Sequence, residues 1–250
     1  MDIILPRSEY VYRVKRFFRF TNKELYDLAI SIFVVTLVFA FDDGRQEFSI
    51  FPWLGNFISV LILVAIAYVA HVSIQKLVGF IPGYRSEYKV WGWGIVFALL
   101  LTFVTQGKWV FVATGGVFVY AMTAQRIGHF RYGLSGSYSI IIASSGAIIN
   151  IAMALFFKLF FLVSGSPLMW MAMKINLWLA IYSMLPIPPL DGGTAFFGGR
   201  LPWSFFFGFV LAGVFMIWLF NNVFTIIFGT LLLAIILWLI FYLVVERFAY

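Results

Sequence analysis

The sequence predicts an all-α polytopic membrane protein with about seven to eight transmembrane segments and a small membrane-embedded β element. Of its 250 residues, 63% are hydrophobic and only 11% are charged, and the mean hydropathy is +1.01. So few polar side chains cannot cover the surface of a water-soluble domain. Apolar stretches long enough to cross a bilayer recur along the chain. We therefore expect a protein integral to the cell membrane and exclude a soluble one.

Residues 1–24 form a basic segment in which six Lys and Arg side chains are interleaved with Tyr and Phe. This pattern is typical of an amphipathic helix on an anionic membrane surface. A nucleic-acid-binding arm is the rival interpretation, but a predicted span follows at once, so we expect no nucleic-acid partner. Thr21 and Glu24 have the spacing of a capping box that opens the next helix. The chain has no cysteine, which excludes disulfides and thiolate metal sites.

Residues 25–250 are predicted to form a single transmembrane domain. The basic loops fall on one side of it, which predicts that both termini are cytoplasmic. Lys158 lies inside an apolar stretch, where we expect it to snorkel to the outer edge or to pair with an acid. The predicted spans are 25–41, 51–78, 94–105, 139–163, 170–185, 203–220 and 224–245.

The β element is predicted from two stretches. In 84–90 a charged residue stands at every second position (Arg85, Glu87 and Lys89). This alternation is typical of a strand with one polar face. The stretch 108–122 contains F-V-A-T-G-G-V-F-V-Y, which is β-rich around a Gly-Gly pair. It fits either a partly buried hairpin, which we favour, or a membrane crossing that would suit the loop charges better.

The most informative stretch is 176–193, in which an apolar helix runs into L-P-I-P-P-L-D-G-G. Its three prolines forbid a continuous helix. A membrane tolerates the resulting unpaired carbonyls only where protein or a wet cavity surrounds them. An acid at such a break, here Asp191, is therefore a candidate functional residue. The alternative is a helix end at the membrane surface with Asp191 solvated.

This stretch resembles the second signature of the site-2 protease family, the intramembrane zinc metalloproteases. In that family an Asn-containing helix, matched here by Asn176, runs into L-P-x-P-x-L-D-G, and the resemblance implies that Asp191 corresponds to a zinc ligand. Residues 145–150, S-G-A-I-I-N, are similar to the family's A-G-P-x-x-N and end at Asn150. The resemblance implies a helical core over about 68–193, with flanking helices 25–41, 203–220 and 224–245.

A zinc hydrolase of this class also needs histidine ligands and a carboxylate base, usually supplied by H-E-x-x-H on one helix. The corresponding residues here read H-V-S-I-Q, from His71 to Gln75. Val72 occupies the general-base position and has no proton-accepting group, while Gln75 replaces the second histidine with a poor, neutral ligand. Two other residues could in principle complete the site: His129 as a ligand and Glu87 as a base. His129 lies in a basic loop, which opposes cation binding, and the spacing of Glu87 from His71 does not favour a role as base.

We expect His71 and Asp191 to meet as a hydrogen bond or ion pair that joins two helices, which offsets the cost of burying each group. Gln75 is expected to donate its amide to Asp191 or to a freed carbonyl near Pro186. We expect no catalytic residue and no cofactor. If any metal binds, His71 and Asp191 are the residues that would hold it.

The sequence therefore predicts a pseudoprotease that binds a membrane protein partner or serves as a structural subunit of a larger membrane complex, in contact with membrane lipids. One alternative is an active intramembrane zinc metalloprotease with an altered site. A second alternative is a transporter, because broken helices with buried polar groups also suit solute sites. A transporter of that kind would require internal repeats, and the sequence contains none that we recognise.

Overall fold

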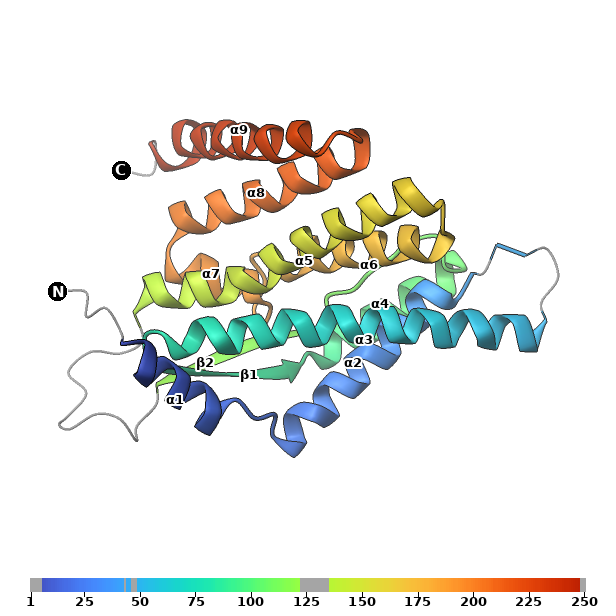
Figure 1. Ribbon diagram of the computed structural model, residues 1–250, viewed down its shortest axis with the longest axis horizontal. Coiled ribbons are helices and arrows are strands. Elements are labelled where there is room, and N and C mark those ends of the chain that lie inside the picture. Colours follow the sequence, from blue (N-terminus) through green and yellow to red (C-terminus); the bar gives the residue numbers. More distant parts are fainter. Residues whose placement is uncertain (1–5, 43, 46–48, 122–134, 248–250) are drawn as a thin grey trace.

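A computed structural model describes residues 6–42, 44–45, 49–121 and 135–247. The described chain is mostly helical and contains two short strands (Figure 1). The elements are α1 (Arg7–Phe17), α2 (Asn22–Ala40), α3 (Ile50–Phe80), β1 (Tyr84–Val90), α4 (Gly92–Thr105), β2 (Gly115–Ala121), α5 (Gly136–Ser164), α6 (Pro167–Ser183), α7 (Asp191–Gly198), α8 (Arg200–Leu219), α9 (Val223–Phe241) and the π-helical η2 (Tyr242–Glu246).

Four helical segments of the described chain are long and apolar enough to cross a membrane: α3, α5, α8, and α9 continued by η2. They agree with the membrane character that the composition predicts. The larger number of seven to eight spans would also require α2, α4 and α6, which do not meet the same criterion of length and composition. That larger number stays a prediction.

The β element is a two-stranded antiparallel sheet in which Tyr84 pairs with Ala121 and Val90 with Gly115. The predicted strand at 84–90 is confirmed. The hairpin within 108–122 is wrong, because its β-rich half forms one strand that pairs with β1 across the intervening α4. The two glycines open this strand instead of turning it. A Cβ atom at Gly116 would lie 2.4 Å from the carbonyl oxygen of Pro189, so glycine permits the close approach of β2 to the Pro-rich break.

The outer edge of β1 is capped by a buried ion pair from α2 and α3. Lys76 Nζ lies 2.8 Å from Glu24 Oε1, and both side chains are 2% exposed. Glu24 accepts the backbone N–H of Tyr88 (3.1 Å), and Lys76 donates to the carbonyl of Ser86 (3.0 Å). The predicted capping box is also confirmed, since Glu24 and Thr21 exchange their reciprocal hydrogen bonds. Glu24 thus begins α2 and fixes α2 to the sheet.

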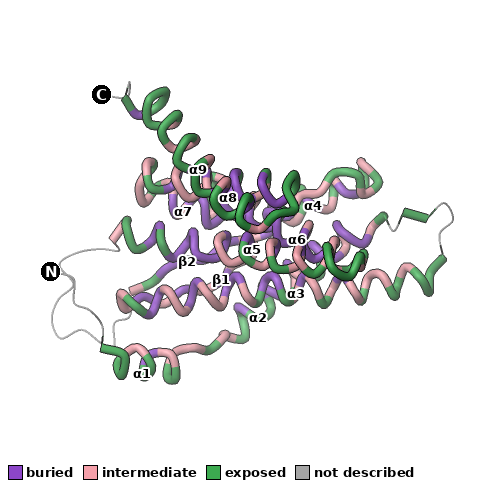
Figure 2. The backbone as a smooth tube through the Cα atoms, turned by 45° about the horizontal axis from the view of Figure 1, so that its top comes forward, coloured by how far each residue is buried: buried purple, intermediate pink, exposed green. Residues whose placement is uncertain are grey.

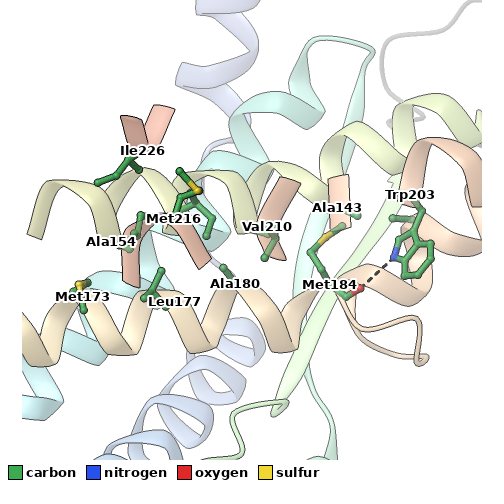
Figure 3. Packing of buried hydrophobic residues seen from close by; sticks show 14 of the residues in the cluster. Ala143, Ala154, Met173, Leu177, Ala180, Met184, Trp203, Val210, Met216 and Ile226 are labelled. Carbon is green, nitrogen blue, oxygen red and sulfur yellow. Dashed lines mark hydrogen bonds between the residues drawn. The ribbon is translucent and has the colours of Figure 1, made fainter. Parts of the chain in front are cut away.

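The helices pack around two main apolar clusters. One lies among α5, α6, α7, α8 and α9; within it Trp203 donates its indole N–H to the Met184 carbonyl at 3.1 Å (Figure 3). The other lies among α2, α3, α6 and the sheet. Figure 2 shows that the outer side of α9 is exposed, whereas the middle of α5 is buried. Within β2, Val117 and Val119 are buried, while Phe118 and Tyr120 are exposed. One face of the sheet and the start of α7 therefore lie inside the protein.

Helix α1 packs against the C-terminal end of α3. Arg13 donates to the carbonyls of Phe80 (2.8 Å) and Ile81 (3.2 Å), which are among the carbonyls that a helix end leaves without partners. Lys158 plays a similar part at the end of α8. It is 3% exposed and donates to the carbonyl of Ile217 at 2.5 Å. The expectation that Lys158 snorkels outward or pairs with an acid is therefore wrong for the described residues.

Candidate functional site

Asp191 is the first residue of α7 and is 1% exposed. The Pro-rich break folds back so tightly that a Cβ atom at Gly192 would lie 2.1 Å from the backbone of Met184. The alternative of a solvated acid at the membrane surface is therefore wrong. The break instead holds the carboxylate inside the protein, at a helix N-terminus where negative charge is favoured.

The Asp191 carboxylate joins α7 to α3 and to β2. Its Oδ2 lies 2.8 Å from His71 Nε2, which confirms that these two residues meet across the fold. Its Oδ1 accepts the backbone N–H of Val117 at 2.7 Å. The edge of β2 is thus satisfied at this point by a side chain in place of a neighbouring strand.

Both ring nitrogens of His71 are engaged. Asn150 on α5 places its amide Nδ2 2.9 Å from His71 Nδ1. An amide N–H₂ group only donates, so Nδ1 accepts, and Nε2 then carries the hydrogen that is donated to Asp191. The imidazole ring thus lies between an amide and a carboxylate. We call His71, Asp191, Asn150 and the Val117 N–H the polar clamp.

Gly146 is the residue of α5 that lies directly against the ring. A Cβ atom there would lie 2.3 Å from His71 Nε2. The small residues of S-G-A-I-I-N therefore allow α5 to approach α3 closely, as small residues do between membrane helices. The Val117 N–H and Gly146 are the two parts of the site that sequence reasoning did not assign. The signals were present in the Gly-Gly pair before Val117 and in the Ser-Gly-Ala run around Gly146.

Gln75 lies one helical turn after His71 but serves a different purpose from the expected one. Its amide donates to the carbonyl of Ala143 on α5 at 3.0 Å, and not to Asp191 or to a carbonyl near Pro186. The reason is that this turn of α3 faces α5. Its side-chain oxygen has no partner among the described residues. Val72 is fully buried in the apolar cluster that includes Tyr88 and Val117.

Asn176 is buried but does not join the polar clamp. Its amide donates to Ala172 of its own helix at 2.8 Å. Glu87 pairs with Arg85 at 2.8 Å along β1, which leaves it engaged away from His71. His129 falls in 122–134, outside the described residues. Neither Asn176 nor Glu87 therefore supplies what Val72 and Gln75 lack.

These donors do not fit a hydrolytic zinc centre. Such a centre takes three protein ligands and an open position for water. The described residues contain no group of three or more His, Cys, Asp or Glu side chains that could hold a metal ion. The two family-type ligands that are present, His71 and Asp191, are bonded directly to each other. The other ring nitrogen of His71 faces an amide donor.

Fold and site together define a polytopic membrane protein with a buried His–Asp pair where α3, α5, α7 and β2 meet. Over 182 residues the chain is 32% identical to "Putative zinc metalloprotease MJ0611" of Methanocaldococcus jannaschii, an alignment that covers 70% of this chain and 84% of that protein. The chain belongs to the family of this metalloprotease. No family model matches the chain, and no solved structure matches it.

Proposed function

We propose that this chain is a pseudoprotease of the site-2 type: a family member that retains the scaffold of a membrane metalloprotease and has lost its hydrolytic centre. The single observation that carries the proposal is the polar clamp. His71 and Asp191 bond to each other at 2.8 Å, in the place where the resemblance implies a shared zinc ion. This pair supplies only two of the three protein ligands that such a centre takes.

The missing chemistry supports the same conclusion. Zinc-dependent hydrolysis requires a group that takes a proton from the metal-bound water. The resemblance puts that group at residue 72, where a valine lies fully buried among apolar side chains. Gln75 stands in place of the second histidine, and its amide donates a hydrogen bond to the carbonyl of Ala143. Two essential functions are thus replaced by packing and by a helix-to-helix hydrogen bond.

A protein of this kind acts by binding. We propose that it holds a membrane protein partner or serves as a structural subunit of a membrane complex. Its polar groups tie α3, α5, α7 and the sheet into one body, which suits a scaffold. The exposed apolar side chains of α9 offer surface to lipid or to another membrane helix (Figure 2).

The arrangement in the membrane is part of the proposal. We place a site-2-protease-like core at about 68–193, because His71, Asn150 and Asp191 all fall inside it. We also place both termini in the cytoplasm. In support of a common side, α1 and the C-terminal end of α9 lie at the same end of the helices in Figure 1. Because the chain has no cysteine, Lys15→Cys and Arg247→Cys can each be probed with a membrane-impermeant maleimide.

Metal content tests the central proposal. Protein purified in the presence of zinc should retain far less than one zinc per chain, and the double variant Val72→Glu/Gln75→His should acquire close to one. His129→Ala is the matched control for binding by the loop histidine. If the unaltered chain holds one zinc that His71→Ala abolishes and His129→Ala does not, and if it cleaves a membrane peptide, the chain is the active metalloprotease instead.

A further inference from the structure

We propose that a groove between α5 and the α8–α9 hairpin binds one acyl chain of an anionic phospholipid, whose headgroup is held by Lys158. The groove has a volume of about 230 Å³, below the roughly 300 Å³ at which sites for drug-sized molecules begin. Its walls include Ile151 and Leu155 of α5, Ile217 of α8, and Ile226 of α9. A single narrow chain fits such a space better than a ring system.

The chemistry of the groove selects an apolar ligand from the bilayer. Thr230 is the only polar side chain among its lining residues. A water-soluble ligand would therefore leave most of its polar groups unpaired, which is costly in an apolar site. Ala152, Ile227 and Leu231 line the groove and are exposed. The groove thus opens onto the surface that acyl chains cover.

Lys158 provides the anchor for a negative headgroup. It follows Leu155 by three residues and Ile151 by seven, so it continues the stripe of α5 that lines the groove. Its ammonium group donates to the carbonyl of Ile217, which also lines the groove. A lysine ammonium has three N–H donors, and none of the ion pairs among the described residues involves Lys158. An anionic oxygen would compensate this buried charge.

The position of Lys158 along α5 suits a headgroup. It lies six residues before Ser164, the last residue of α5, which corresponds to ~9 Å at 1.5 Å per residue. The α8–α9 turn lies at the same end of the helices (Figure 1). The ammonium therefore lies within about two helical turns of the C-terminal end of α5, while Ile148 and Thr230 extend the groove away from that end. The inference does not depend on whether the protein cleaves peptides.

The test is native mass spectrometry of the full chain, delipidated in detergent and then given phosphatidylglycerol, phosphatidylcholine of the same acyl chains, or oleate. We expect one retained phosphatidylglycerol, preferred over phosphatidylcholine by about fivefold, which is the factor for ~1 kcal/mol per basic residue at an anionic surface. Lys158→Gln should reduce this ratio to about one, while Lys158→Arg and the control Lys174→Gln should preserve it.

Ala152→Phe tests the groove itself, independently of Lys158. Ala152 is exposed, so the larger side chain fills the groove from its open side without disturbing the core, and it should abolish retention of every lipid. Circular dichroism and size-exclusion chromatography verify folding of each variant. The proposal is overturned if folded Ala152→Phe retains phosphatidylglycerol as the unaltered chain does, if folded Lys158→Gln keeps the fivefold preference, or if oleate alone is retained.

Discussion

Removing the Asp191 carboxylate should destabilise the protein more than removing any isolated acid. The carboxylate accepts two buried hydrogen bonds, from His71 Nε2 and from the Val117 N–H. In Asp191→Ala both donors lose their partner in a site that is closed to water. Each unpaired buried donor costs about 1–3 kcal/mol, so we expect a loss of roughly 2–6 kcal/mol in the free energy of unfolding.

A double-mutant cycle isolates the bond between the two side chains. His71→Ala alone strands a buried carboxylate, and breaking a buried pair from one side costs about 3–5 kcal/mol. Once either partner is absent, removing the other costs less. The double variant should therefore be more stable than the sum of the two losses predicts, by ~0.5–3 kcal/mol, the usual range for residues in direct contact.

The assay is unfolding of the full chain in mixed micelles, followed by circular dichroism as the fraction of denaturing detergent rises. Asp27→Ala is the matched control, because Asp27 is also buried, at 7% exposure, and has no side-chain hydrogen bond found among the described residues. Asp191→Asn keeps an acceptor for Val117 and should lose less than Asp191→Ala. A coupling below ~0.5 kcal/mol, or an Asp191→Ala loss no larger than that of Asp27→Ala, would refute the polar clamp.

Three further outcomes follow from the sheet and its surroundings. Gly116→Ala should unfold or misassemble the protein, since its Cβ atom would meet backbone at 2.4 Å, whereas Gly55→Ala has open space around it; expression and size-exclusion chromatography compare the two. Lys76→Ala should cost about 3–5 kcal/mol by stranding Glu24, as measured by the same micelle titration. Burial raises the pKa of Tyr88 above its ordinary 10.0, so the folded state holds this proton more tightly than the unfolded state. Stability should therefore fall as pH rises above about 10, and Tyr88→Phe should make that fall smaller.

The parts of the fold that could be predicted are those set by local sequence. Composition alone predicts the membrane class, the alternation at 84–90 predicts β1, and the Thr21–Glu24 spacing predicts the capping box. The residues of β2 could be recognised as β-rich, but their pairing with β1 could not be predicted. A Gly-Gly pair suits a turn and a close backbone approach equally well, and only the position of Pro189 decides between them.

The site divides in the same way. The meeting of His71 and Asp191 follows from the resemblance and the cost of burying either group alone. The destination of the Gln75 amide could not be predicted, because it depends on how far α3 is rotated toward α5. Lys158 was misjudged for a related reason. From the sequence, a buried lysine is expected to pair with an acid or to reach the membrane surface. Here Lys158 instead donates to the carbonyl of Ile217, near the end of α8.

The capped edges of the two-stranded sheet have a consequence for how it can grow. An isolated pair of strands normally offers two rows of free backbone groups to any extended peptide that approaches. Here Glu24 and Lys76 already occupy the β1 row at Ser86 and Tyr88, and a carboxylate occupies the β2 row at Val117. An incoming peptide could form backbone hydrogen bonds at those residues only by displacing a buried charged side chain. The sheet is therefore limited to two strands and protected at these residues from edge-to-edge aggregation.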